Sequence, residues 1–131
     1  MSSANKGLKG VVAADSTVCF IDGQTGELWY SGYNIHELAE HSTFEEVSYL
    51  LLKGELPSRA ALADFSQTLA QHRSLRPEVL AFLSSLPRDV LPMAALRSAV
   101  SMSGIYDPSA EDASAEANYI KSVQLIAEMA T

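Results

Sequence analysis

The sequence contains almost no cysteine and no long apolar run. Cys19 is its single cysteine, so an internal disulfide is excluded, and its apolar neighbours predict a buried, inert thiol. No run approaches the roughly 20 apolar residues that span a bilayer. The start, Met1–Lys6, has no apolar signal-peptide core behind it. These absences predict a cytoplasmic protein.

Positive charge is also scarce, with nine Lys and Arg against sixteen Asp and Glu, a net charge of −7. Such a surface repels phosphate backbones and anionic lipid, which argues against nucleic-acid or membrane binding. The phosphate-binding glycine motifs and the G-x-S-x-G nucleophile motif are missing. What is present is 47 % hydrophobic and 19 % charged residues, the balance of a globular protein with a buried core.

The hydrophobic pattern predicts short strands first and helices afterwards. Residues 11–14, 17–21 and 28–30 are expected strands, and two glycines in the connection 22–27 suit a hairpin turn. From residue 34 onward the apolar spacing is helical. The expected helix starts are Asn34, Thr43, Ser58, Arg76–Pro77, Pro92 and Ser114. The predicted fold is mostly α with a small N-terminal β-hairpin.

The helix ends carry their own signals. Thr43, with Glu45 or Glu46 beyond it, resembles a capping box, and Lys53–Gly54 suits a helix C-terminus. The helix between them is expected to be buried on most sides. The expected inward residues there and in later helices are Phe44, Val47, Leu50, Leu51, Leu62, Phe65, Leu69, Val79, Leu80, Leu83, Leu86, Met93, Leu96, Val100, Tyr119, Val123, Ile126 and Ala130.

His36 and His41 bracket a segment that invites comparison with the H-E-x-x-H zinc motif. That motif needs histidines four residues apart, whereas these are five apart and lie about 140° apart around a helix. We expect two solvent-facing histidines, and a metal hydrolase is the weakest functional hypothesis.

The other chemical candidates favour structural roles. His72 and Arg73 suit the negative end of a helix, and Trp29 suits a core or an interface. Arg97 is the lone cation in a small, apolar helix, so a structural partner, a carboxylate or a carbonyl, is expected ahead of a substrate contact. Composition and spacing alone therefore assign no reaction.

The order of the segments is more specific than any single motif. Residues 7–13, 21–28 and 30–35, followed by Leu38–Ala39, resemble the opening of citrate synthases. Residues 43–57 resemble the family's first long buried helix and its stop, and Pro92–Ser101 resembles its proline–methionine helix start. The resemblance runs from about residue 7 to 131, and it is greatest to the shorter bacterial and archaeal type. The 2-methylcitrate synthases share the same opening.

The resemblance implies a mostly helical homodimer with a large and a small domain per subunit. Its active site lies between the domains, where oxaloacetate and acetyl-CoA are condensed to citrate and CoA in the tricarboxylic acid cycle. In that family an aspartate acts as the base, two histidines polarise the substrates, and arginines hold carboxylates. None of these groups matches a position here. Many members also have His before the Pro–Met pair, where this chain has Leu91.

We therefore predict a flexible segment at 1–6 and, at 7–131, the N-terminal part of a citrate synthase large domain. This part has no catalytic, cofactor-binding or metal residues and is inactive alone. The last apolar helical stripe still runs at Thr131, which favours a truncated chain. The alternatives are a non-catalytic helical interaction module derived from this family, and a fragment of a 2-methylcitrate synthase that uses propionyl-CoA.

Overall fold

The computed structural model describes residues 15–131, which form three short strands followed by six helices. The mostly helical prediction is confirmed. The expected strand at 11–14 and the expected flexible segment at 1–6 lie outside the described residues. The chain divides into two compact units, Met1–Leu62 and Ala63–Thr131.

The first unit contains an antiparallel sheet in the order β1-β2-β3. Strands β1 (Cys19–Asp22) and β2 (Glu27–Tyr30) form the predicted hairpin, with Phe20 opposite Trp29. The third strand, β3 (Tyr33–Asn34), was not predicted because two residues carry no alternating pattern. Two successive left-handed residues between β2 and β3, Ser31 (φ 45°) and Gly32 (φ 89°), give the tight turn that joins them.

Two capped helices complete the first unit. In α1 (Ile35–His41), the side chain of Asn34 accepts the backbone N–H of His36, as the sequence predicts. In α2 (Phe44–Lys53), Thr43 and Glu46 form the predicted capping box, and Gly54 ends the helix at φ 84°.

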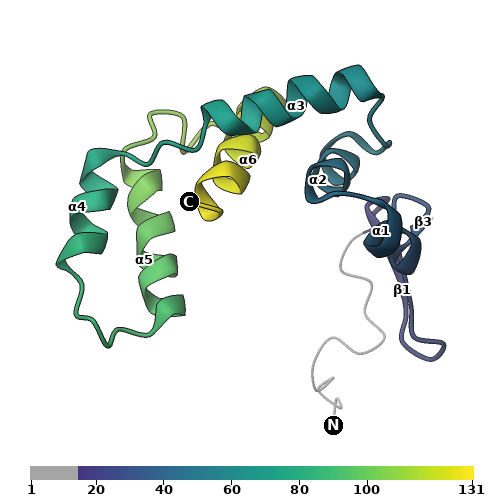
Figure 1. The fold of residues 1–131 in the computed structure, drawn as a ribbon, viewed down its shortest axis with the longest axis horizontal. Helices are drawn as coiled ribbons and strands as arrows, with labels where there is room; N and C mark the ends of the chain where they lie inside the picture. Colours follow the sequence, from purple (N-terminus) through teal and green to yellow (C-terminus); the bar gives the residue numbers. More distant parts are fainter. Residues whose placement is uncertain (1–14) are drawn as a thin grey trace, which may run out of the picture. The chain divides into compact units, whose positions relative to one another are not determined.

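Helix α3 (Arg59–Gln71) begins in the first unit and ends in the second, and the Ser58 hydroxyl accepts the N–H of Ala61 at its start. The second unit continues with α4 (Pro77–Ser85), α5 (Pro92–Ile105) and α6 (Ala115–Met129). Helices α4 and α5 pack side by side as a helical hairpin (Figure 1).

Each unit buries a small set of apolar side chains. In the first unit Leu38 and Leu50 are buried. In the second, the buried side chains on its four helical segments are Phe65, Leu69, Val79, Ala99, Ala117, Val123 and Ala127. Four of these, Phe65, Leu69, Val79 and Val123, are among the residues expected to face inward.

Several residues expected to be inward are exposed instead. On α2, Phe44 is 65 % exposed and Leu51 37 %, so this helix is not buried on most sides. Leu80 on α4 (49 %) and Met93 on α5 (71 %) are exposed too. Cys19 is exposed as well, which corrects the prediction of a buried thiol. The physical reason is that an apolar pattern reports which face can be buried, whereas burial requires a neighbouring element, and these faces have none among the described residues.

Candidate functional site

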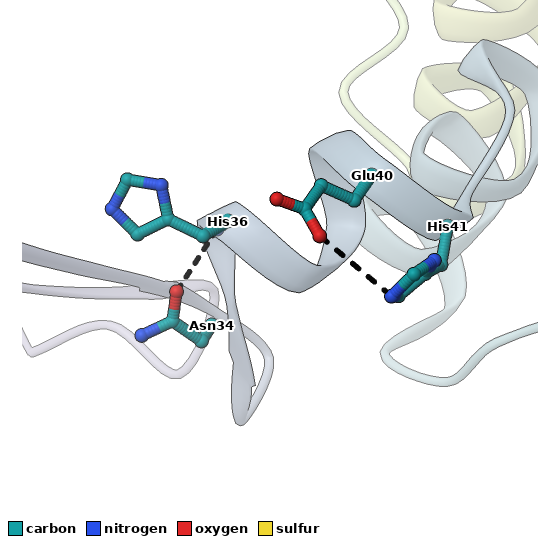
Figure 2. Close-up of polar contacts among 4 residues, drawn as sticks. All are labelled: Asn34, His36, Glu40 and His41. Atoms are coloured by element: carbon teal, nitrogen blue, oxygen red, sulfur yellow. Dashed lines mark hydrogen bonds and ion pairs between the residues drawn. The ribbon is translucent and has the colours of Figure 1, made fainter.

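The two histidines of the zinc-like segment do not converge. His36 lies in the first turn of α1 and His41 in its last, and Figure 2 shows their rings at opposite ends of the helix, pointing apart. Nε2 of His41 lies 3.9 Å from Oε2 of Glu40, with both side chains about three-quarters exposed (76 % and 75 %). In residues 15–131 no three His, Cys, Asp or Glu side chains are grouped to hold a metal ion.

His72 and Arg97 were both expected to have structural roles. Nδ1 of His72 lies 2.8 Å from the carbonyl oxygen of Thr68, so this ring pairs with the last turn of α3, in keeping with the predicted helix-terminal role. Arg97 is exposed on α5, and within residues 15–131 neither a hydrogen bond nor a carboxylate partner engages it. The structural partner expected for Arg97 is therefore not found in the described part of the chain.

A cluster of hydrogen bonds joins Lys121 on α6 to the loop that connects α5 and α6. Its Nζ donates hydrogen bonds to the carbonyl oxygens of Ser109 (3.2 Å), Ala110 (3.1 Å) and Asp112 (2.6 Å). Oδ1 of Asp107 accepts from both the N–H (2.8 Å) and the hydroxyl (2.7 Å) of Ser109. This cluster fixes the loop and the start of α6. It is structural, since its donors and acceptors are already paired with one another.

Two carboxylates of this loop, those of Asp107 and Asp112, are held in the charged form. The hydroxyl and N–H of Ser109 lower the pKa of Asp107, with smaller help from the charges of Lys121 and Arg76. The backbone N–H and side chain of Ser114 lower the pKa of Asp112, again with a contribution from Lys121. A general base needs a pKa near the working pH. Lowered carboxylate pKa values therefore indicate loop stabilisation, not proton transfer.

An apolar groove lies beside this cluster in the second unit. The α4–α5–α6 groove is a hollow of about 130 Å³, lined by Leu75, Val79, Leu83, Leu96, Ala99, Val100, Ser103, Leu125, Glu128, Met129 and Thr131. A cavity of about 150 Å³ accommodates a benzene molecule. The groove therefore has room for one large apolar side chain. Its lining offers no nucleophile paired with a base.

Sequence reasoning missed both the Lys121 cluster and the groove. Lys121 reads as an ordinary surface lysine, because its partners are backbone carbonyls that no residue type reveals. Only four of the groove residues, Val79, Leu83, Leu96 and Val100, were expected to face inward, and only the structure shows that the lining encloses a hollow. No helix in residues 15–131 is long and apolar enough to cross a lipid bilayer.

Comparison with known proteins identifies the family. The family model described as "Citrate synthase, C-terminal domain" matches residues 7–131. The citrate synthase of Deinococcus radiodurans is 42 % identical over 131 residues, which are 100 % of this chain and 35 % of that protein. A 2-methylcitrate synthase of Mycobacterium tuberculosis is 39 % identical over 126 residues, 96 % of this chain and 32 % of that protein.

The fold agrees with the sequence match. A citrate synthase from Thermoplasma acidophilum, solved as a ternary complex with carboxymethyl coenzyme A and oxaloacetate, superposes with a TM-score of 0.89 at 25 % identity. The superposition covers 98 % of this chain and 34 % of that one. The chain thus spans about a third of the length of the relatives it matches. The family model, the sequence identity and the fold agree over nearly every residue. This chain therefore belongs to the citrate synthase family.

Proposed function

We propose that this chain is the N-terminal, helical part of the large domain of a citrate synthase. The intact polypeptide would condense acetyl-CoA with oxaloacetate and release citrate and CoA, the entry step of the tricarboxylic acid cycle. One observation carries the proposal: the whole chain aligns with a citrate synthase at 42 % identity while spanning 35 % of its length. The solved relative in complex with oxaloacetate and a coenzyme A derivative supports the choice of substrates.

Within that enzyme the chain acts as a scaffold. Condensation requires a base to remove a methyl proton from the thioester and an oriented donor to stabilise the enolate oxygen. The described histidines offer no such pair: His36 and His41 point apart on α1, and His72 contacts the carbonyl of Thr68. The reactive groups therefore belong to the two-thirds of the relatives' length that this chain does not span.

The scaffold role includes assembly. Large apolar side chains remain exposed on both units, among them Phe44 (65 %) and Met93 (71 %), and such surfaces favour association. We propose a cytoplasmic homodimer for the intact enzyme, with oxaloacetate and acetyl-CoA as its small-molecule partners and no bound cofactor in this part.

Two alternatives make different predictions. A 2-methylcitrate synthase would take propionyl-CoA. A relative of that name is 39 % identical to this chain, compared with 42 % for the citrate synthase of Deinococcus radiodurans. A non-catalytic interaction module would have no further catalytic segment encoded next to this chain.

The test is a thiol-release assay with oxaloacetate on two proteins, residues 1–131 and the product of the complete open reading frame. We expect turnover only from the complete product, and faster turnover with acetyl-CoA than with propionyl-CoA. The reverse preference would favour the 2-methylcitrate alternative. Turnover by residues 1–131 alone would contradict the scaffold role, and an inactive complete product would contradict the synthase.

A further inference from the structure

The α4–α5–α6 groove has the shape and the chemistry of a docking site. Leu96, Val100 and Ser103 follow one another at helical spacing along α5, and Leu125 and Met129 do so along α6. Leu96 (36 %), Leu125 (41 %) and Met129 (57 %) stay substantially exposed beside the buried Ala99. Rows of side chains at this spacing form the grooves into which a further helix packs.

Glu128 gives this apolar groove one charged position. It lines the groove and also the adjoining hollow beside Lys121. Its Oε1 accepts a hydrogen bond from Nε2 of Gln124 at 2.7 Å, which holds the half-buried carboxylate in place. Within residues 15–131 no basic side chain pairs with Glu128, since the Nζ of nearby Lys121 donates to three carbonyls. The groove therefore presents a fixed, uncompensated negative charge in apolar surroundings.

This charge argues against a second copy of the chain as the occupant. A two-fold contact places the same surface of both copies together. It would bring two Glu128 carboxylates into one apolar interface, and the groove lining offers no cation to offset either.

We propose that the groove receives an amphipathic helix from the part of the same polypeptide beyond residues 1–131. This inference rests on the proposed function, because the matched relatives are about three times as long as the part that aligns here. The helix would insert one large apolar side chain between Leu96, Leu125 and Met129 and place one Lys or Arg against Glu128. The charged pair would fix the register of the helix, while the apolar contacts supply most of the affinity.

Site-specific crosslinking in the product of the complete open reading frame tests this placement. A photo-reactive amino acid at position 125 faces the groove, whereas position 120, with Ile120 49 % exposed on the same helix and outside the groove lining, is the matched control. We expect position 125 to crosslink within one polypeptide to a helix outside residues 1–131, and position 120 not to reach that helix. A crosslink from position 125 to a second copy of residues 1–131 would overturn the proposal, as would a reading frame that ends at Thr131.

The charge is tested separately with Glu128→Gln and the exposed loop control Glu111→Gln. In the complete product we expect Glu128→Gln to lower Tm by a few degrees and Glu111→Gln to leave it unchanged. Equal effects of the two variants in the complete product would overturn the role of Glu128.

Synthase turnover is measured on the same samples, so that the two proposals fail separately. An active product that yields no crosslink from position 125 to a helix beyond residue 131 overturns the docking proposal alone. A product with that crosslink but without turnover supports docking and contradicts the proposed activity.

Discussion

The side-chain nitrogen of Lys121 lies 2.6 Å from the carbonyl oxygen of Asp112, nine residues before it in the chain. The same ammonium group also donates to the carbonyls of Ser109 and Ala110. Backbone carbonyls in a loop lack the partners that a helix or a sheet provides. The carbonyl of Ser109 also accepts the N–H of Asp112 in a turn, whereas for Ala110 and Asp112 the lysine is the donor. One lysine on α6 therefore bonds three loop carbonyls and ties the α5–α6 loop to the helix that follows it.

Replacing Lys121 by Met keeps most of the side-chain volume and removes all three donors. Hydrogen bonds to charged groups contribute about 1.5–3 kcal/mol when fully formed. Because Lys121 is half-buried and its carbonyl partners can turn to water, we expect a loss of about 1–2 kcal/mol in the free energy of unfolding. Urea denaturation followed by circular dichroism measures this loss.

The control for that variant is Arg97→Met, which removes a cation that has no partner among residues 15–131. We expect the free energy of unfolding to change by less than about 0.5 kcal/mol. Equal destabilisation by the two variants would mean that loss of a positive charge, not of the carbonyl contacts, is responsible.

Local signals were the part of the fold that the sequence predicted well. The cap at Asn34, the capping box of Thr43 and Glu46, and the glycine stop at residue 54 depend on residues within one turn of each other. Such contacts form wherever the helix forms, so their sequence pattern is sufficient. The hairpin of β1 and β2 was predictable for the same reason, because its turn residues are adjacent in the chain.

Tertiary features were not predictable from the same patterns. Leu80 and Val79 are neighbours on α4, both expected to face inward, yet Leu80 is 49 % exposed and Val79 only 1 %. Which of them is covered depends on the position of α5, and single-sequence spacing does not contain that information. The α4–α5–α6 groove was missed for this reason, whereas the family resemblance, which rests on segment order, was confirmed by the comparisons.

The capping box of α2 offers a second quantitative test. Thr43 Oγ1 accepts the N–H of Glu46 at 3.2 Å, and Oε2 of Glu46 accepts the N–H of Thr43 at 2.7 Å. Thr43→Ala removes the first bond and leaves an N-terminal donor without its partner. We expect a loss of about 1 kcal/mol in the free energy of unfolding. Thr43→Ser retains a hydroxyl acceptor, so its denaturation midpoint should stay close to that of the parent protein.

Replacing glycine by alanine is expected to destabilise the protein at Gly54 and to stabilise it at Gly104. Gly54 has φ 84°, and an added Cβ would meet nothing within 4 Å, so Gly54→Ala carries backbone strain alone. The left-handed conformation costs a residue with a Cβ about 1–2 kcal/mol. Gly104 lies near the end of α5, without a positive φ and also with nothing within 4 Å. There, Gly104→Ala should stabilise the protein by about 0.5–1 kcal/mol.

Thermal denaturation of the two glycine variants decides between strain and crowding. We expect a lower Tm for Gly54→Ala and a higher Tm for Gly104→Ala. A lower Tm for Gly104→Ala would show that its added Cβ meets a neighbour in solution. An unchanged Tm for Gly54→Ala would show that the end of α2 adopts another backbone conformation.

Acid stability follows from the loop carboxylates. Hydrogen bonds from Ser109 hold the pKa of Asp107 below its ordinary value of 3.8, and those from Ser114 do the same for Asp112. A carboxyl whose pKa is lower in the folded state binds protons more weakly there than in the unfolded state. Its stabilising contribution is therefore complete above pH 3.8 and is lost as the pH falls through the folded-state pKa.

We therefore expect the urea concentration at the unfolding midpoint to decrease as the pH is lowered below about 4. Protonation of Asp107 and Asp112 contributes to the steepness of that decrease. Asp107→Asn removes one titrating group, so the midpoint should decline less steeply below pH 4 while being lower at pH 7. Asp89→Asn is the control, since Asp89 is exposed and accepts no hydrogen bond among residues 15–131. If Asp107 contributes to acid sensitivity, its replacement must make the midpoint depend less on pH. An equally steep decrease of the midpoint in Asp107→Asn and in the parent protein would therefore assign the acid sensitivity to other carboxyl groups.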